Sequence, residues 1–314
     1  FIVEFLQPLT VSGKQPRCWK IMTNKIVPPA EIGFVGLGNM GYPMARCLVN
    51  AGYQLTVADL NTEAVEKFCQ ETGSKAAENL QSLGASSDVV ITMLPEGNAV
   101  RQVLMSEDGV VSGLQQGTIL VDMSSCSPVG TRQLAGELEA LGFALIDAPV
   151  SGGVYKAADG ALSIMVGGEK SVVEICLPLL EVMGKPFQTG GPASGHAMKA
   201  MNNYLSAASL AIASEAVILG SKFGLDPEIM VDVLNASTGR SNSTEHKFPA
   251  FILPRTFNSG FFIGLMAKDL RLARELAESE GTSADLLMLV SSMWDKAEAK
   301  LGFKADNTEV YKYL

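Results

Sequence analysis

The sequence has few cysteines and no excess of positive charge, and each shortage excludes a class of protein. Its five cysteines are scattered and show no Cys-x-x-Cys spacing, so neither a disulfide framework nor a metal site is expected. Reduced thiols favour a cytoplasmic protein. The net charge of −9 argues against a nucleic-acid partner. No stretch approaches about 20 uninterrupted apolar residues, so no membrane span is expected.

The composition is otherwise that of a globular protein with room for two domains. The chain has 314 residues, of which 47% are hydrophobic and 18% are charged. Residues 1–29 differ from the rest, because they hold four prolines and show no usable periodicity. They are expected to form an unstructured or leader-like extension outside the fold. Basic residues outnumber acidic ones there, so a mitochondrial presequence stays open, as does a natural start at Met22.

A glycine-rich turn follows the first apolar run, between a strand that ends at Val35 and a helix that runs to Leu48. Its spacing is G-x-G-x-x-G. The first glycine permits the tight bend, the second lets a pyrophosphate approach the backbone, and the third lets helix and strand pack closely. Amides at the start of the helix then face the phosphates. The residues expected to bind a dinucleotide here are Gly36, Leu37, Gly38, Asn39, Met40 and Gly41.

An acidic residue stands where the ribose of a dinucleotide would be bound. A second apolar strand, residues 54–58, ends in Asp59, about 20 residues beyond the glycine turn. No Arg or Lys follows Asp59 until Lys67, so no cation is in place for a 2′-phosphate. NAD is therefore the expected cofactor, with NADP less favoured. A glycine turn without any ligand is the structural alternative.

Short apolar runs alternate with amphipathic stretches from residue 30 to residue 193. This alternation predicts βαβ units, and hence a Rossmann-type doubly wound parallel sheet with helices on both faces. Further strands are expected at residues 88–94, 118–122, 143–147 and 162–166. Ligands of such sheets bind beyond the carboxyl ends of the strands, so the loops that follow these strands should line one crevice.

The pattern becomes helical after residue 193. Residues 196–223 read as one helix about 40 Å long that is apolar nearly all round. Such a helix is expected to be buried on every side, as the centre of a domain. Further helices are expected to begin near Asp226, Met266 and Ser283. Residues 194–314 are therefore predicted to form an all-helical domain around this long central helix.

Two polar motifs on this background could carry chemistry. Residues 147–153 end in Ser151, Gly152 and Gly153, which offer a hydroxyl and two unhindered amides to a carboxylate. A glycine turn between strands is the plain alternative. The sequence of residues 265–270 places a lysine beside an acid at the expected start of a helix, where a solvated ion pair is the alternative.

A third polar motif lies in the long apolar helix. Lys199 and Asn203 are four residues apart and so lie on one helix face. Burial there would lower the pKa of the lysine toward neutrality, as a proton-transferring amine requires. A lysine whose amine reaches solvent from a helix end is the alternative. As proton carriers, His196 and His246 are less well placed than Lys199.

In this order, the motifs GFVGLGNMG, DAPVSGG, GHAMKAMNN and LMAKDL resemble the β-hydroxyacid dehydrogenase family over residues 31 to about 312. The resemblance implies a dinucleotide-binding domain at 30–193 and a helical domain at 194–314 that also forms homodimers or homotetramers. It implies hydride transfer between NAD and a small 3-hydroxy acid similar to 3-hydroxyisobutyrate. A reductase of tartronate semialdehyde or another small semialdehyde is an alternative within the family. A dinucleotide-sensing module without turnover is an alternative of a different class.

The resemblance also implies roles for single residues. Lys199 would be the catalytic acid/base, and Asn203 would hold substrate and lysine. The substrate carboxylate would be bound by Ser151, Gly152 and Gly153. Lys268 would reach the nicotinamide end of the site and contact both substrate and cofactor. The other cofactor contacts would come from Leu94, Pro95, Asn98 and Ser125.

Overall fold

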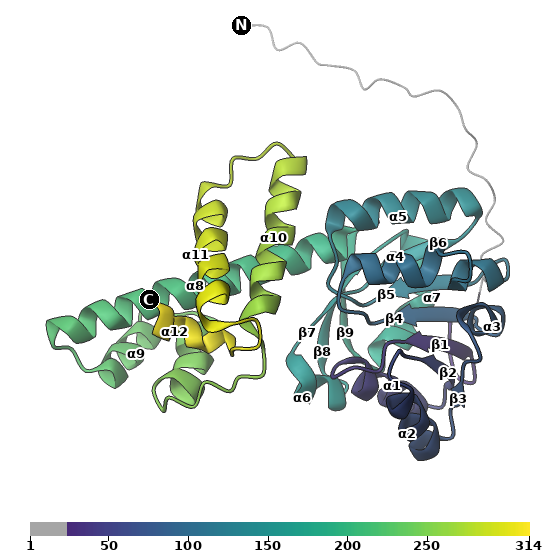
Figure 1. Cartoon of the computed structure of the whole chain (residues 1–314), viewed down its shortest axis with the longest axis horizontal. Coiled ribbons are helices and arrows are strands. Elements are labelled where there is room, and N and C mark those ends of the chain that lie inside the picture. The colour runs from purple at the N-terminus through teal and green to yellow at the C-terminus, as the bar shows by residue number, and fades with distance from the viewer. Residues whose placement is uncertain (1–23) are drawn as a thin grey trace, which may run out of the picture.

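The computed structural model describes residues 24–314, which form two halves joined by one long helix (Figure 1). Most of the expected extension, residues 1–23, lies outside the described residues. The described part of this extension, residues 24–29, packs against the fold. Ile26 is buried, its amide donates to the Ile175 carbonyl (3.0 Å), and its carbonyl accepts from the Tyr53 hydroxyl (3.0 Å). The predicted boundary at residue 30 is therefore too late, because one buried residue beside two prolines shows no periodicity.

The N-terminal half is built on a sheet that has nine strands within residues 24–314, in the order β3-β2-β1-β4-β5-β6-β8-β7, with β9 beside β8. Strands β1 to β6 run parallel to one another, which confirms the doubly wound arrangement. The strands are β1 Glu31–Val35, β2 Gln54–Ala58, β3 Lys75–Ala76, β4 Val89–Thr92, β5 Ile119–Asp122, β6 Ala144–Asp147, β7 Val150–Ser151, β8 Leu162–Gly167 and β9 Gly184–Gly190.

One end of the sheet departs from the prediction. Strand β8 runs antiparallel to both β6 and β7, so the sheet is mixed and not wholly parallel. The connection from β6 to β8 contains β7 and a short helix, α6 (Gly153–Ala158), and the chain reverses within it, so that β8 runs back beside both β6 and β7. The DAPVSGG motif begins at the last residue of β6 and continues into this connection, where the chain turns back along the sheet edge.

Helices cover both faces of the sheet. The helices of this half, besides α6, are α1 Gly41–Asn50, α2 Thr62–Thr72, α3 Leu80–Ala85, α4 Gly97–Met105, α5 Pro128–Leu141 and α7 Lys170–Glu181. Because side chains alternate along a strand, Ile91 of β4 enters the core beneath α1 and α7, while Val90 enters the core beneath α4 and α5. A short 3-10 turn, η1 (Val110–Gly113), follows α4.

Helix α8 (Ser194–Phe223) begins against β8 and β9 and continues into the C-terminal half (Figure 1). There it contacts the helices that follow it, so the predicted central helix is confirmed. By length and composition alone α8 would suffice to cross a membrane, a test that core helices also pass. The later helices are α9 Pro227–Ala236, the wide π-type helix η2 Ser243–Ile252, α10 Ile263–Ser279, α11 Asp285–Leu301, η3 Asn307–Glu309 and α12 Val310–Tyr313.

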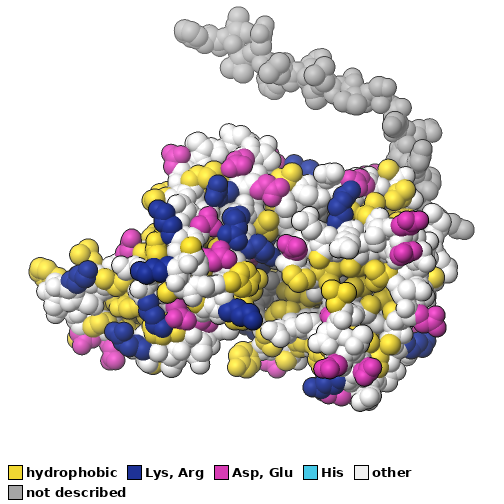
Figure 2. Space-filling view, viewed as in Figure 1, with side chains coloured by type: hydrophobic (Ala, Val, Ile, Leu, Met, Phe, Trp, Pro, Cys, Tyr) yellow, Lys and Arg dark blue, Asp and Glu magenta, His cyan; other side chains and the backbone are white. Residues whose placement is uncertain are grey.

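The expectation that α8 is buried on every side is wrong. Leu205 and Ile212 are each 63% exposed, and Leu219 is 70% exposed. These three residues are spaced by seven and therefore form one row along the helix, called here the α8 stripe. The neighbouring helices cover only the other side of α8. In Figure 2, hydrophobic side chains are seen at the far end of α8 and over α9.

Candidate active site

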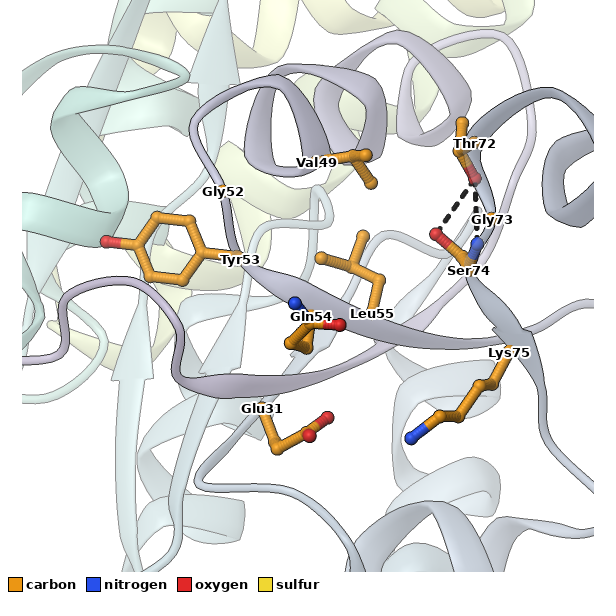
Figure 3. Close-up of a pocket in the computed structure, with 10 residues that line it drawn as sticks. All are labelled: Glu31, Val49, Gly52, Tyr53, Gln54, Leu55, Thr72, Gly73, Ser74 and Lys75. Carbon is orange, nitrogen blue, oxygen red and sulfur yellow. Dashed lines mark hydrogen bonds between the residues drawn. The ribbon is translucent and has the colours of Figure 1, made fainter.

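One cavity is excluded as the active site by its position in the sheet. It is shown in Figure 3 and is lined by Glu31, Gln54 and Lys75, at the amino ends of strands β1 and β2 and in β3. Doubly wound sheets bind their ligands at the opposite, carboxyl edge. The candidate site therefore lies where the strands end.

The glycine turn lies at this carboxyl edge. Gly36 has φ +105°, and a Cβ there would lie 2.2 Å from the Met93 carbonyl oxygen. A Cβ at Gly41 would lie 1.9 Å from the Gly36 oxygen. The fold therefore requires both glycines. A Cβ at Gly38 would meet no atom within 4 Å, so open space remains beside the start of α1, where a pyrophosphate fits.

Asp59 is held against the same turn. One of its carboxylate oxygens accepts from the Leu37 amide (2.6 Å), and the other accepts from the Asn61 amide (2.7 Å). Its neighbour Leu60 is fully exposed. A carboxylate fixed beside the phosphate turn, with no cation next to it in sequence, fits a ribose with free hydroxyls. Asn39 and Met40 complete the turn before α1.

The loops after β4 and β5 are tied to each other and to the helical half. The Leu94 amide donates to the Ser124 hydroxyl (2.9 Å). Lys268 of α10 donates from Nζ to the Ser125 carbonyl (2.8 Å) and to the Pro95 carbonyl (3.2 Å). Asn98 is exposed on the first turn of α4, close in sequence to this loop. The residues predicted to contact the cofactor thus lie along one edge.

Asp269 links the two halves from a buried position. One carboxylate oxygen accepts from the Ser125 hydroxyl (2.8 Å), and the other accepts from the Asn203 side-chain amide. We expected Lys268 and Asp269 at the start of a helix. Helix α10 instead begins at Ile263, so both residues lie in its second turn, and Asp269 is buried rather than solvated.

Lys199 lies at the junction of the two halves. Its Nζ donates to the Val150 carbonyl (2.8 Å). Burial lowers the pKa of this amine, the Asp269 carboxylate opposes that shift, and the Lys268 charge adds to it. The lysine is therefore held close to one carboxylate and one other cation.

The predicted carboxylate-binding loop follows directly after Val150. Ser151 is half-buried, whereas Gly152 and Gly153 are exposed. Both glycines have positive φ, +142° and +72°, and a Cβ at Gly152 would lie 2.8 Å from the Lys156 side chain. The backbone requires glycine here, and the loop lies next to the carbonyl that holds Lys199.

The two histidines take no position suited to proton transfer with a ligand. His196 is buried, and both ring nitrogens are engaged, Nδ1 with the Thr131 hydroxyl (2.9 Å) and Nε2 with the Ser124 carbonyl (3.0 Å). His246 is exposed on η2.

A buried acidic pair that was not predicted from the sequence surrounds His196. Asp122 and Asp147 end β5 and β6, and their carboxylates lie 3.8 and 3.7 Å from the imidazole. Cys126 donates to Asp122, and burial raises the pKa of this thiol well above its usual value. The sequence held one indication of this pair: two neighbouring strands, β5 and β6, each end in an aspartate just before a loop that is expected to line the crevice.

Comparisons with known proteins cover both halves. The NAD binding domain of 6-phosphogluconate dehydrogenase matches residues 31–201, and the NAD-binding domain of NADP-dependent 3-hydroxyisobutyrate dehydrogenase matches residues 193–314. The chain is 37% identical to 2-(hydroxymethyl)glutarate dehydrogenase of Eubacterium barkeri, over 90% of this chain and 94% of that protein. It is 36% identical to mouse mitochondrial 3-hydroxyisobutyrate dehydrogenase, over 95% of this chain and 89% of that protein.

A solved structure is similar over nearly the whole described chain. The 3-hydroxyisobutyrate dehydrogenase of Mycobacterium tuberculosis, solved with L-serine, superposes with a TM-score of 0.84 at 32% identity. The match covers 90% of this chain and 98% of that one. Both halves of the fold, and the way they are joined, are therefore shared with a protein of known structure.

Proposed function

The chain belongs to the β-hydroxyacid dehydrogenase family and is a dehydrogenase of small hydroxy acids with an NAD(P)-binding domain, and we propose that it oxidises a 3-hydroxy acid with NAD, using Lys199 as general acid/base. One observation carries this proposal. Lys199, Asn203 and Asp269 from the helical half meet the loop that follows β6 and the loop that follows β5. A substrate held there lies between the dinucleotide turn and the lysine.

The proposed chemistry assigns a proton to one atom. NAD, when bound, supplies the hydride acceptor for the carbon that carries the hydroxyl. Neutral Lys199 accepts the hydroxyl proton at Nζ, and its lowered pKa increases the neutral fraction at physiological pH. Asn203, held by Asp269, lies one helical turn further on and orients the hydroxyl. In the reverse direction, the charged amine returns the proton to the reduced carbonyl.

The loop at Ser151, Gly152 and Gly153 is proposed to bind the substrate carboxylate. It offers a hydroxyl and backbone amides within a few residues of the Val150 carbonyl that holds Lys199. The net charge of −9 gives no global attraction for an anion, so local donors must supply it. Lys268 is proposed to bring its charge to the nicotinamide end, because it already contacts both cofactor loops.

A panel of substrates tests the proposal. Formation of NADH would be followed with 3-hydroxyisobutyrate, 2-(hydroxymethyl)glutarate, L-serine and a simple alcohol that lacks a carboxylate. Tartronate semialdehyde would be tested with NADH in the opposite direction, as the alternative substrate. We expect turnover only with substrates that carry a carboxylate. Equal turnover of the simple alcohol would refute the substrate class.

We also propose that the protein is a homodimer or homotetramer that covers the α8 stripe. Leu205, Ile212 and Leu219 form an apolar row of heptad spacing, suited to pack against a second helix. Ile229 of α9, 63% exposed, extends the apolar surface. Sedimentation of the wild type and of Ile212→Glu tests this. The variant should sediment as a smaller species, and an unchanged mass would exclude this surface.

A further inference from the structure

Asp147 caps helix α8 across a long stretch of chain. One of its carboxylate oxygens accepts from the Ala193 amide (2.7 Å), and the other accepts from the His196 amide (2.8 Å). Ala193 stands at the N-cap position with φ +71° and has no side chain able to accept a hydrogen bond. The first amides of a helix need acceptors, and an anion suits that end of the helix dipole. The Asp147 carboxylate provides both the acceptor oxygens and the negative charge.

Two glycines bring this carboxylate, the sheet and the helix start into close contact. A Cβ at Gly195 would lie 2.3 Å from the Met165 carbonyl oxygen and 2.9 Å from the Asp147 carboxylate. A Cβ at Gly167 would lie 2.5 Å from the other oxygen of that carboxylate. No side chain fits between these groups. The start of α8 is therefore set by direct contact with the end of β6.

His196 holds the same turn from its other side. Its ring bonds the Thr131 hydroxyl of α5 and the Ser124 carbonyl after β5. Its main-chain amide bonds Asp147. Asp147 and His196 are called here the helix clamp, since together they tie the first turn of α8 to three elements of the dinucleotide-binding half.

The clamp lies one turn from the proposed acid/base. Lys199 follows His196 by three residues, and its Nζ bonds the carbonyl of Val150, which follows Asp147 by three residues. The same short segment thus caps the helix, receives the lysine and continues into the carboxylate-binding loop at Ser151. A displacement of about 1 Å between reacting groups can cost about a hundredfold in rate.

We propose that Asp147, together with His196, is a positioning residue that sets the place of Lys199 relative to the carboxylate-binding loop. This inference rests on the proposed function, because it assigns to Lys199 the proton transfer. Asp147 does not touch the substrate in this scheme. It acts through the helix whose first turn it holds.

Asp147→Asn tests the clamp. The side-chain NH₂ group of the asparagine would face one of the two main-chain amides that the carboxylate now accepts from, so one of the two hydrogen bonds is lost. We expect kcat for the hydroxy acid to fall at least tenfold, while the Kd for NAD changes less than twofold. Loosening the turn lets water reach Lys199, whose pKa burial lowers, so the acid limb of the kcat/KM profile moves to higher pH. Asp269 and Lys268, the charged groups that face Lys199, are unchanged in this variant.

The matched control is Asp88→Asn. Asp88 also accepts a backbone amide, that of Glu31 (3.0 Å), but at the opposite edge of the sheet. This variant should leave kcat and the pH profile as in the wild type. If Asp147→Asn does not fold, Thr131→Val removes one bond of the clamp at nearly constant volume. It should lower kcat two- to fivefold and shift the profile in the same direction.

A measurement independent of turnover separates this inference from the proposed function. The rate at which acetic anhydride labels Lys199 across pH, read by mass spectrometry, reports the titration of the amine. We expect its midpoint to rise in Asp147→Asn. An unchanged midpoint and kcat in a folded clamp variant overturn the inference. Full turnover by Lys199→Ala would instead overturn the proposed role of the lysine and leave the labelling result standing.

Discussion

The side-chain amide of Asn203 donates to the carboxylate of Asp269, and this contact joins α8 to α10 beside Lys199. The second oxygen of Asp269 accepts from the Ser125 hydroxyl (2.8 Å), which belongs to the dinucleotide-binding half. One buried carboxylate thus connects both halves at the level of the proposed proton transfer. Substitutions near Asp269 should therefore affect the rate of turnover and the binding of NAD to different extents.

Replacing Lys199 by Ala should abolish nearly all turnover. Loss of a general acid/base costs about 10²- to 10⁴-fold in rate. Binding of NAD, measured by quenching of tryptophan fluorescence or by calorimetry, should persist, because the glycine turn is on separate elements. Lys300→Ala, an exposed lysine of α11, is the control and should retain full activity. A Lys199→Ala rate above half that of the wild type would overturn the assignment.

The pH profile should respond in opposite directions to two substitutions near Lys199. Burial lowers the pKa of Lys199, Asp269 raises it, and Lys268 lowers it. Asp269→Asn removes the carboxylate, so the pKa falls further and the acid limb of kcat/KM for oxidation moves to lower pH. Lys268→Ala removes a like charge, so the limb moves to higher pH, and kcat falls. Shifts of the same sign in both variants would contradict this electrostatic account.

The wild type should prefer NAD to NADP by at least about tenfold in kcat/KM, because Asp59 repels a 2′-phosphate. The double change Asp59→Ser with Leu60→Arg should narrow this gap, since Leu60 is fully exposed beside Asp59. It should also weaken NAD binding, because Asp59 no longer accepts from the Leu37 amide. Leu60→Arg alone is the control and should keep the preference. Better use of NADP by the wild type would show that Asp59 has another role.

Replacing Gly152 by Val should raise KM for 3-hydroxy acids strongly and change NAD affinity little. Its φ of +142° and the nearby Lys156 side chain leave no room for a branched residue, so the loop must shift. Gly136→Ala on α5 is the control, because a Cβ there meets no atom within 4 Å. Steady-state kinetics of both variants decide the matter, and an unchanged KM in Gly152→Val would remove this loop from the substrate site.

Lys247 on η2 should destabilise the folded protein at neutral pH. Burial lowers its pKa to about 8, and the Asp306 carboxylate only partly opposes this. The folded state loses this proton near pH 8 and the unfolded chain near 10.5, so this group makes stability rise with pH between those values. Lys247→Met should therefore add about 3 kcal/mol to the free energy of unfolding at pH 7, and the gain should vanish near pH 10.5.

Urea unfolding at pH 7 and pH 10.5 measures this difference. Lys304→Met, at an exposed position between α11 and η3, serves as the control and should leave stability unchanged at both values. A destabilised Lys247→Met at pH 7 would mean that the lysine contributes favourable contacts that outweigh the cost of its buried charge.

Local patterns could be predicted from the sequence, whereas contacts made at a distance could not. The glycine turn and the shared face of Lys199 and Asn203 follow from spacings of a few residues. The cap that Asp147 provides joins residues 46 or more positions apart, and no spacing encodes it. The exposure of the α8 stripe was not predicted for a similar reason. Apolar residues show the same sequence pattern whether a neighbouring helix or a second chain covers them.

The unbroken course of α8 also bears on how ligands enter and leave. The helix is fixed at its start by Asp147 and His196 and further along by the packing of α10 and α11, and it contains no proline. The two halves therefore cannot swing apart about a hinge inside it. Any movement between the halves must instead be absorbed by the segment that precedes the helix, and it would have to break the contacts of Lys268 with the Pro95 and Ser125 carbonyls, which cross between the halves.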